Sequence, residues 1–157
     1  MNMAKMFKQT STVHLENVSD AGLWNSFATI FKQQDQFKSA YVDKVRISFV
    51  QEDQLTTTTG AVVPWLPVMF AAANSSTLSN TPSSNDQNII ASSAGRGGGV
   101  VTLNIKRRIV TNEIDDESGE GAIRLFIKAS DPTQLAGDGQ FYLIIETYGR
   151  WHRCDSL

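Results

Sequence analysis

The stretch AYVDKVRISFVQED, residues 40–53, alternates between two kinds of side chain over most of its length. In an extended chain every second side chain lies on the same face. One face here is largely apolar and carries Tyr41, Asp43, Val45, Ile47 and Phe49. The opposite face is polar and carries Lys44, Arg46 and Ser48. This alternation predicts a long strand with one buried side and one solvent side.

Other segments share this strand character. Residues 10–18 alternate polar and apolar side chains, and three strongly apolar strands follow at 100–110, 122–130 and 140–151. Their separators are acidic or rich in glycine and proline, which is typical of turns. The strand predicted at 61–74 contains two prolines, so we expect it to be a sheet edge or to be interrupted. Residues 74–99 predict two loops around a small strand at Ile89-Ile90.

One segment has a helical spacing instead. After Ser19, a plausible N-cap, the apolar residues Leu23, Phe27, Ile30 and Phe31 fall at i, i+4, i+7 and i+8. This spacing predicts one short helix near residues 20–33 that covers an end of the core.

About eight strands without alternating helices indicate an all-β fold, either a closed barrel or two antiparallel sheets. We expect residues 10–157 to form this domain. Residues 1–9 would be an N-terminal arm that either frays or docks on a neighbouring subunit or a lipid surface. The predicted core consists of Val45, Ile47, Phe49, Leu103, Ile105, Leu125, Ile127, Leu143 and Ile145.

The composition narrows the classes of function. The chain has 157 residues, 41% of them hydrophobic, which suits one folded domain. The net charge of −2 argues against a protein that wraps nucleic acid over its whole surface, so such a contact needs a local patch. The single cysteine, Cys154, excludes an internal disulfide framework. No apolar run reaches the roughly 18–20 residues that cross a bilayer, and the first residues lack the pattern of a signal peptide.

The glycine-rich stretch SSAGRGGG, residues 92–99, has the composition of a phosphate-binding loop. Such a loop opens a helix and ends in Gly-Lys-Ser or Gly-Lys-Thr. Here Val100 and Val101 begin a strand, and Val100 also occupies the position where a dinucleotide-binding motif needs its last glycine. We therefore expect the glycines to allow positive φ in a connection between strands.

No catalytic constellation emerges from the sequence. The two histidines, His14 and His152, lie at opposite ends of the chain, and the serines lack a G-x-S-x-G elbow. Cys154 near His152 is interpreted as a surface thiol. We expect no enzyme activity, no cofactor and no metal held by one chain. The acidic run of Asp115, Asp116, Glu117 and Glu120 predicts either a solvated turn or a calcium site that a neighbouring subunit completes.

Basic residues gather on the late strands. Lys106 and Arg108 share one face of a strand, and Arg124 and Lys128 share one face of the next. On a solvent face these four residues would contact phosphates without reading bases. The alternative is an ordinary solvated surface. Arg107 is expected on the opposite face, where it needs a carboxylate partner if it is buried.

Aromatic and basic residues also alternate near the C-terminus. Tyr148, Trp151 and His152 lie between or beside Arg150 and Arg153. Aromatic rings beside cations are typical of sites that stack bases. The same residues would equally suit burial in a subunit contact.

The order of these elements resembles the single jelly-roll capsid proteins of small icosahedral viruses, most in the style of small single-stranded DNA viruses and satellite viruses. The resemblance covers nearly the whole chain. It is carried by the entry strand with Phe37, Tyr41, Val45, Ile47 and Phe49, by the late basic strand, and by a terminal strand with little after it. It implies one antiparallel jelly roll of two packed four-stranded sheets.

The resemblance also implies a function. The chain would be a structural subunit of the virion that assembles with copies of itself into a closed icosahedral shell around a genome. Such proteins often carry a basic arm, whereas the first ten residues here contain only Lys5 and Lys8. Packaged nucleic acid against a non-specific basic face, other capsid proteins and an internal membrane are therefore alternative partners. The rival function is a carbohydrate-binding or receptor-binding β-sandwich that exposes Trp65 or Trp151.

Overall fold

The computed structural model of the chain describes residues 4–18, 23–30, 37–63, 65–74, 89–96, 98–110, 123–129 and 139–153. Every regular element in these ranges is a β-strand, which confirms the all-β prediction. The strands are β1 (Ala4–Val18), β2 (Asn25–Thr29), β3 (Phe37–Gln51), β4 (Leu55–Thr56), β5 (Val62–Val63), β6 (Pro67–Ala73), β7 (Ile89–Arg96), β8 (Gly98–Val110), β9 (Arg124–Ala129) and β10 (Gly139–Arg153).

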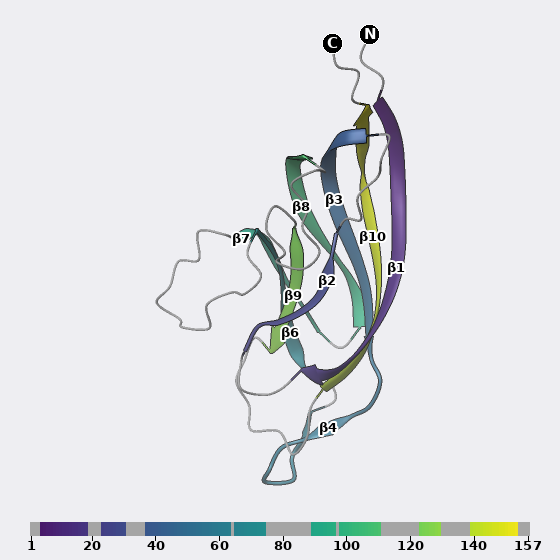
Figure 1. Cartoon of the computed structure of the whole chain (residues 1–157). Coiled ribbons are helices and arrows are strands. Elements are labelled where there is room, and N and C mark those ends of the chain that lie inside the picture. The colour runs from purple at the N-terminus through teal and green to yellow at the C-terminus, as the bar shows by residue number, and fades with distance from the viewer. Residues whose placement is uncertain are drawn as a thin grey trace.

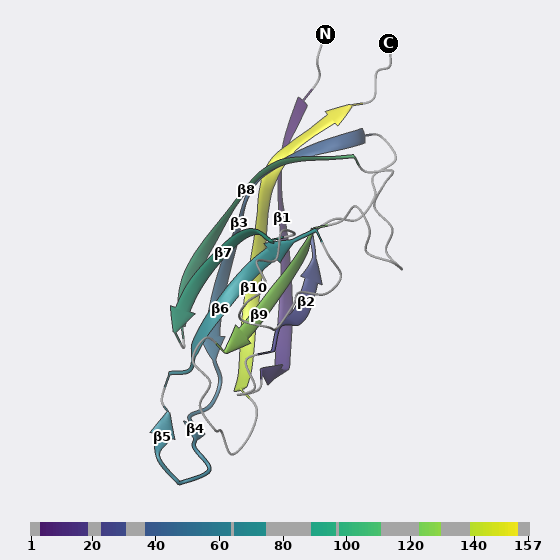
Figure 2. The ribbon, with the colours of Figure 1, turned by 90° about the vertical axis from the view of Figure 1, so that its left-hand side faces the viewer.

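The strands form two four-stranded sheets and one small hairpin. Sheet A has the order β1-β10-β3-β8, sheet B has the order β2-β9-β6-β7, and β4 pairs with β5. Every one of these pairs is antiparallel. Figure 1 shows the long strands of sheet A along one side of the molecule and the shorter strands of sheet B along the other. In Figure 2 sheet A continues past sheet B at the end where both termini lie.

The chain crosses between the sheets at almost every connection. The strand β1 lies in sheet A, β2 in B and β3 in A, then β6 and β7 lie in B, and β8, β9 and β10 lie in A, B and A. Apart from β6 and β7, strands that are neighbours in either four-stranded sheet are therefore not consecutive in sequence. This eight-strand order of two interlocked Greek keys is that of a jelly roll. The predicted pair of packed four-stranded sheets is confirmed.

The core lies between the two sheets. All nine predicted core residues are buried there: Val45, Ile47, Phe49, Leu103, Ile105, Leu125, Ile127, Leu143 and Ile145. Across the interior, Phe49 of sheet A packs against Phe70 of sheet B with ring centroids 5.0 Å apart. The period-two pattern of the sequence therefore identified the buried faces of both sheets.

The helix predicted near residues 20–33 is wrong where the structure describes the chain. Residues 25–29 form β2, which pairs with β9. The register shifts between Ser26 and Ala28, so Phe27 is the extra residue of a β-bulge. The Phe27 ring lies 6.1 Å from that of Phe70 and still packs on the core. Hydrogen bonds between the backbone of β2 and the edge of β9 that β6 leaves unpaired favour a strand here, although the spacing of the apolar residues suits a helix.

The faces predicted for the entry strand are correct from Lys44 onward and wrong before it. Val42 is buried, whereas Asp43 is exposed and Tyr41 is half-buried. The register of β3 against both β10 and β8 shifts between Val42 and Lys44. Such a bulge exchanges the two faces of a strand. Tyr41 therefore joins Lys44 on the solvent side of sheet A.

The remaining strands differ from expectation mainly in length. The proline-containing segment is interrupted as predicted, with Pro67 as the first residue of β6. The small strand expected at Ile89-Ile90 runs on to Arg96 as β7. Gly99 has the positive φ expected of the glycine stretch, 143°, but it lies within β8. Residues 4–9, expected as an arm, pair with β10 as the first part of β1.

Candidate nucleic-acid interface

The four residues predicted to contact phosphates lie in two different sheets. Lys106 and Arg108 are exposed on β8, at the edge of sheet A. Arg124 and Lys128 are half-buried on β9, in sheet B. The structure therefore brings each pair together but does not gather the four into one patch.

The pair on β9 lies beside aromatic side chains on the outer face of sheet B. Arg124 and Lys128 flank Phe126, which packs apart from the main core. The Nζ atom of Lys128 lies 4.5 Å from the centroid of the Trp24 ring, a cation–π contact. Among the described side chains, Nε of Arg124 is buried without a hydrogen-bond acceptor. These two cations are thus more enclosed than the pair on β8.

A bulge in β8 exposes three consecutive basic residues. Arg107 pairs with Val42 and Asn104 pairs with Lys44, so β8 has one more residue than β3 between these points. Lys106, within this bulge, has a φ of 49°. As a result Lys106, Arg107 and Arg108 are all exposed. Arg107 shares its register position with the buried Val42, as expected for the opposite face, but its exposure removes the need for a carboxylate partner.

The register of sheet A places more cations beside Arg108. One row across the four strands contains Met6, Arg150, Tyr41 and Arg108, and the next contains Lys8, Tyr148 and Lys44. Directly opposite residues in an antiparallel sheet point to the same face. We name this group the cationic band and define it as Lys8, Lys44, Arg108 and Arg150 with Tyr41 and Tyr148.

The tyrosines of the cationic band lie against its cations. The guanidinium carbon of Arg150 is 4.9 Å from the centroid of the Tyr41 ring. The Tyr148 ring has Nζ of Lys44 at 5.2 Å and Nζ of Lys8 at 5.7 Å from its centroid. Such cation–π contacts orient flexible cationic side chains at little cost in solvation. The cationic band is therefore partly pre-ordered for an anionic partner.

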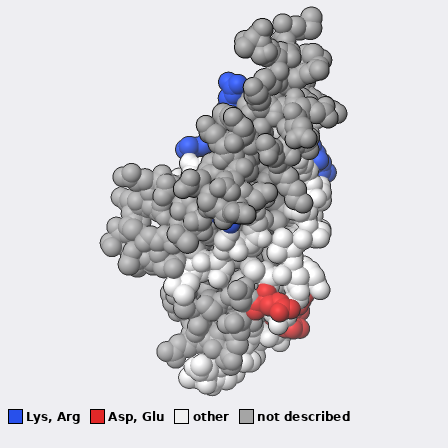
Figure 3. Space-filling model, viewed as in Figure 1, with Lys and Arg blue, Asp and Glu red and all other residues white. Residues whose placement is uncertain are grey.

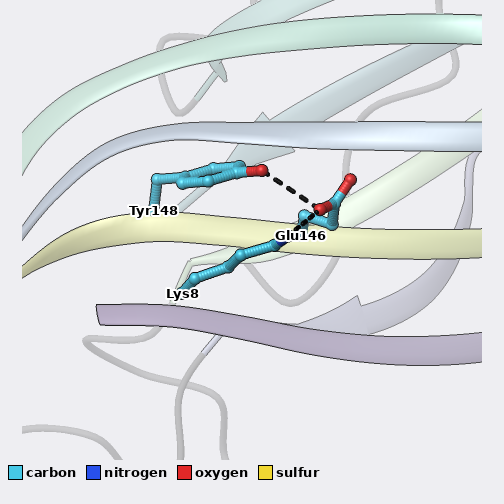
Figure 4. Close-up of polar contacts among 3 residues, drawn as sticks. All are labelled: Lys8, Glu146 and Tyr148. Carbon is cyan, nitrogen blue, oxygen red and sulfur yellow. Dashed lines mark hydrogen bonds and ion pairs between the residues drawn. The ribbon is translucent and has the colours of Figure 1, made fainter.

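One carboxylate, Glu146, is tied into the cationic band. Its Oε2 atom accepts hydrogen bonds from Nζ of Lys8 at 2.8 Å and from the Tyr148 hydroxyl at 3.1 Å (Figure 4). The Lys8 ammonium, followed by the Tyr148 hydroxyl, holds the pKa of Glu146 below its usual value. The same contact raises the pKa of Lys8. Glu146 thus balances the charge of Lys8, and the band as a whole keeps an excess of positive charge.

A pocket of about 550 Å³ opens within the cationic band. It is lined by Met6, Phe7, Tyr41, Asp43, Lys44, Tyr148, Gly149 and Arg150. A Cβ atom on Gly149 would overlap the backbone oxygen of Tyr41 and the Phe7 ring, so only glycine fits at this position. Cations above aromatic rings beside a pocket suit a phosphate with an attached planar group, as in single-stranded nucleic acid.

The sequence contained part of this arrangement. It placed Lys44 on the solvent side and grouped Tyr148 with Arg150 as a stacking candidate, whereas Lys8 was assigned to the arm. What could not be predicted was the register that aligns β1, β10, β3 and β8. Trp151, a second stacking candidate, is buried, and its ring lies 4.8 Å from that of Phe7. The side chain of His152, the third candidate, is not among those that the structure describes.

Other sequence candidates do not form a site in the described residues. His14 contacts Glu52 at 3.0 Å through Nε2 and stacks on Tyr142. No group of three or more histidine, cysteine and acidic side chains in the described ranges is placed to hold a metal ion. Cys154 and the acidic run at 115–120 lie outside those ranges. The same ranges contain no helix long and apolar enough to span a membrane.

Comparison with known proteins finds solved structures of low similarity. No protein-family model and no curated protein matches the chain. Solved structures that are similar include a virus-like particle of the nodavirus of the giant freshwater prawn Macrobrachium rosenbergii, with a TM-score of 0.49 and 5% identity over 96% of this chain and 95% of that chain. Desmodium yellow mottle tymovirus has a TM-score of 0.41 and 6% identity over 98% and 90%. Bacillus endospore appendages, disulfide-linked pili, have a TM-score of 0.33 and 10% identity over 92% and 88%. These TM-scores are low, so the function proposed below rests on the chain's own topology and surfaces.

Proposed function

We propose that this protein is a viral capsid subunit, copies of which assemble into a closed icosahedral shell around a genome in the virion. The observation that supports this most directly is the complete jelly-roll strand order of sheets A and B. Jelly rolls occur in capsid proteins, in lectins and in cupins. The fold alone does not distinguish these functions, so the properties of the surface must be used to distinguish them.

The surface favours contacts with other protein copies. Val62 and Trp65, in the segment that joins β3 to β6, are 58% and 57% exposed. Contiguous exposed apolar side chains are typical of interaction sites, and Val62 and Trp65 lie three positions apart in this segment. Identical copies that repeat the same contacts form closed symmetric assemblies.

The rival functions have less support. The carbohydrate-binding alternative expected Trp65 or Trp151 on the surface, and Trp151 is buried in the chain's own core. Trp65 is the tryptophan that this alternative retains, and a glycan array would test it. A cupin-type enzyme needs a set of histidine and glutamate ligands, whereas the sequence contains two histidines in different parts of the chain.

Within the shell, we infer that the cationic band and the neighbouring Lys106 contact packaged nucleic acid through its phosphates. The support is four cations, two tyrosines and a pocket on one face of sheet A. Arg124 and Lys128 stay a separate proposal. Because the outer faces of two packed sheets point away from each other, one layer of nucleic acid would contact one pair and not the other.

Size-exclusion chromatography with multi-angle light scattering tests the capsid proposal. The purified chain is expected to elute as a large particle of defined mass under at least one condition of salt and pH. Nucleic-acid content follows from the ratio of absorbance at 260 and 280 nm. A chain that stays monomeric or dimeric under all conditions would overturn the shell, and an assembled particle without nucleic acid would overturn the role of the cationic band.

A further inference from the structure

Four exposed apolar side chains lie together on the outer face of sheet A, beyond the cationic band. They are Tyr142 and Ile144 on β10, Val50 on β3 and Val100 on β8, each between 45% and 54% exposed. Eight large apolar side chains are exposed in the described residues, and these four make up half of them. We name them the apolar patch.

The register shows that the apolar patch is continuous. Ile144 pairs with Ser48 and Ser48 pairs with Val100, while Tyr142 pairs with Val50 in the next row. Side chains that are direct or diagonal partners on one face are in reach of each other. The Tyr142 phenol is neutral at ordinary pH, because its usual pKa of 10.0 is raised further by the Glu52 carboxylate, and the patch carries no charge.

Opposite charges flank the apolar patch at its two ends. On the side of the cationic band, the exposed Arg46 lies two positions before Ser48 on β3. Its partner across the strands is Glu146 of β10, which also binds Lys8, so this end keeps a net positive charge. At the other end, Glu52 follows β3 and Glu16 lies on β1, and both contact His14. In Figure 3 the coloured acidic side chains gather at the lower end of the molecule, with basic ones above them. The outer face of sheet A is thus basic, then apolar, then acidic along its strands.

If a second copy is turned end to end along the strands, its acidic end lies opposite the basic end of the first copy, so the two surfaces are complementary. We propose that two copies of this chain associate through the outer faces of sheet A, with the apolar patches in contact and Arg46 of each copy opposite Glu52 of the other. A two-fold axis in the interface, running across the strands between the rows of Ser48 and Val50, produces this arrangement. It also places Tyr142 of one copy on Ile144 of the other. Such an interface is isologous, because each copy uses the same surface.

The size of the surface fits a reversible dimer. Four strands at about 4.8 Å spacing and four rows of outward side chains at about 6.8 Å give roughly 500 Å² per copy. The total of about 1,000 Å² is at the lower end of specific protein interfaces. A membrane or a nucleic acid would be favoured by positive charge at both ends, whereas the acidic end repels them and attracts a second copy. The cationic band at the far end stays outside the contact. Because the dimer covers the same face of sheet A that would meet nucleic acid in a shell, it is proposed for the unassembled protein and does not depend on the capsid proposal.

Sedimentation velocity over a range of concentrations tests the dimer. It is carried out on the unassembled fraction, so that the presence or absence of shells does not affect the result. We expect the wild type to dimerise and the double variant Ile144→Asp, Val100→Asp to raise the dimer dissociation constant by about tenfold or more, because it buries four carboxylates in the contact. The control Leu23→Asp changes a leucine outside sheet A that is 46% exposed, and this variant should dimerise as the wild type does.

A charge exchange tests the geometry of the contact. Arg46→Glu and Glu52→Arg should each weaken the dimer, and the double exchange should restore it. Within one chain the two positions are roughly 20 Å apart along β3, too far to compensate each other. Restoration therefore identifies a contact between copies. A monomeric wild type at the highest soluble concentration, equal affinities for wild type and the Asp double variant, or no recovery in the double exchange would overturn the proposal.

Discussion

At the scale of single residues, Glu146 is better stabilised as a carboxylate in the folded chain than in the unfolded chain, because Lys8 and Tyr148 both donate to it. Its folded pKa is lowered from 4.5, so its stabilising contribution is present above that value and is lost as the pH falls through the folded pKa. Lys8 behaves in the opposite way. Its pKa is raised from 10.5, so its contribution is present below that value and is lost as the pH rises through the folded pKa.

We therefore expect Glu146→Gln to change the pH dependence of stability. The wild type should lose free energy of unfolding more steeply than the variant as the pH falls below 4.5. Urea unfolding at a series of pH values measures this difference. Asp53→Asn, an exposed carboxylate outside the contact, is the matched control and should follow the wild type. If the free energy of unfolding of Glu146→Gln falls as steeply with decreasing pH as that of the wild type, the lowered pKa of Glu146 would be contradicted.

Gly149 allows β10 to pass close to β3 at the floor of the pocket. Gly149→Ala would push a Cβ atom into the backbone oxygen of Tyr41 and the ring of Phe7. We expect a loss of about 1–3 kcal/mol in the free energy of unfolding. Gly98→Ala is the control, because its Cβ would meet atoms no closer than 3.6 Å. Equal stability of the two variants would show that the strands can separate at Gly149 without cost.

At the scale of elements, alternation in the sequence predicted the buried faces well but could not show where the alternation shifts. The bulge at Asp43 moves Tyr41 to the outer face, and the bulge at Lys106 exposes Arg107. Neither bulge has a local signature, because both depend on how a strand aligns with partners distant in sequence. The apolar spacing at residues 23–31 suited a helix, and only the unpaired edge of β9 explains why β2 forms there.

The two basic strands offer a matched pair of variants. Lys106→Gln with Arg108→Gln removes two charges from β8, and Arg124→Gln with Lys128→Gln removes two from β9. If sheet A faces the nucleic acid, the first variant should bind single-stranded oligonucleotide more weakly. A plot of its log affinity against log salt concentration should become less steep, by about one unit of slope for each phosphate that is no longer neutralised. Fluorescence anisotropy measures both. An effect confined to the β9 variant would assign the interface to sheet B instead.

At the scale of the whole molecule, the fold class followed from the sequence because strand alternation and turn chemistry are local. The cationic band and the apolar patch did not, because each combines side chains from three or four strands that only the jelly-roll order brings together. Lys8 and Arg108 illustrate this, since 100 positions of sequence separate two residues that lie in adjacent rows of one sheet. Such a surface cannot be predicted from the sequence before the register of the strands is known.

The central claim is that copies of this chain form a closed shell, and electron microscopy of the purified full-length protein tests it most directly. The protein is imaged in negative stain across the salt and pH conditions in which it stays soluble. The account predicts hollow closed particles of uniform diameter with icosahedral class averages. Fields that contain only monomers and dimers under every condition, or open filaments of unlimited length, would contradict it.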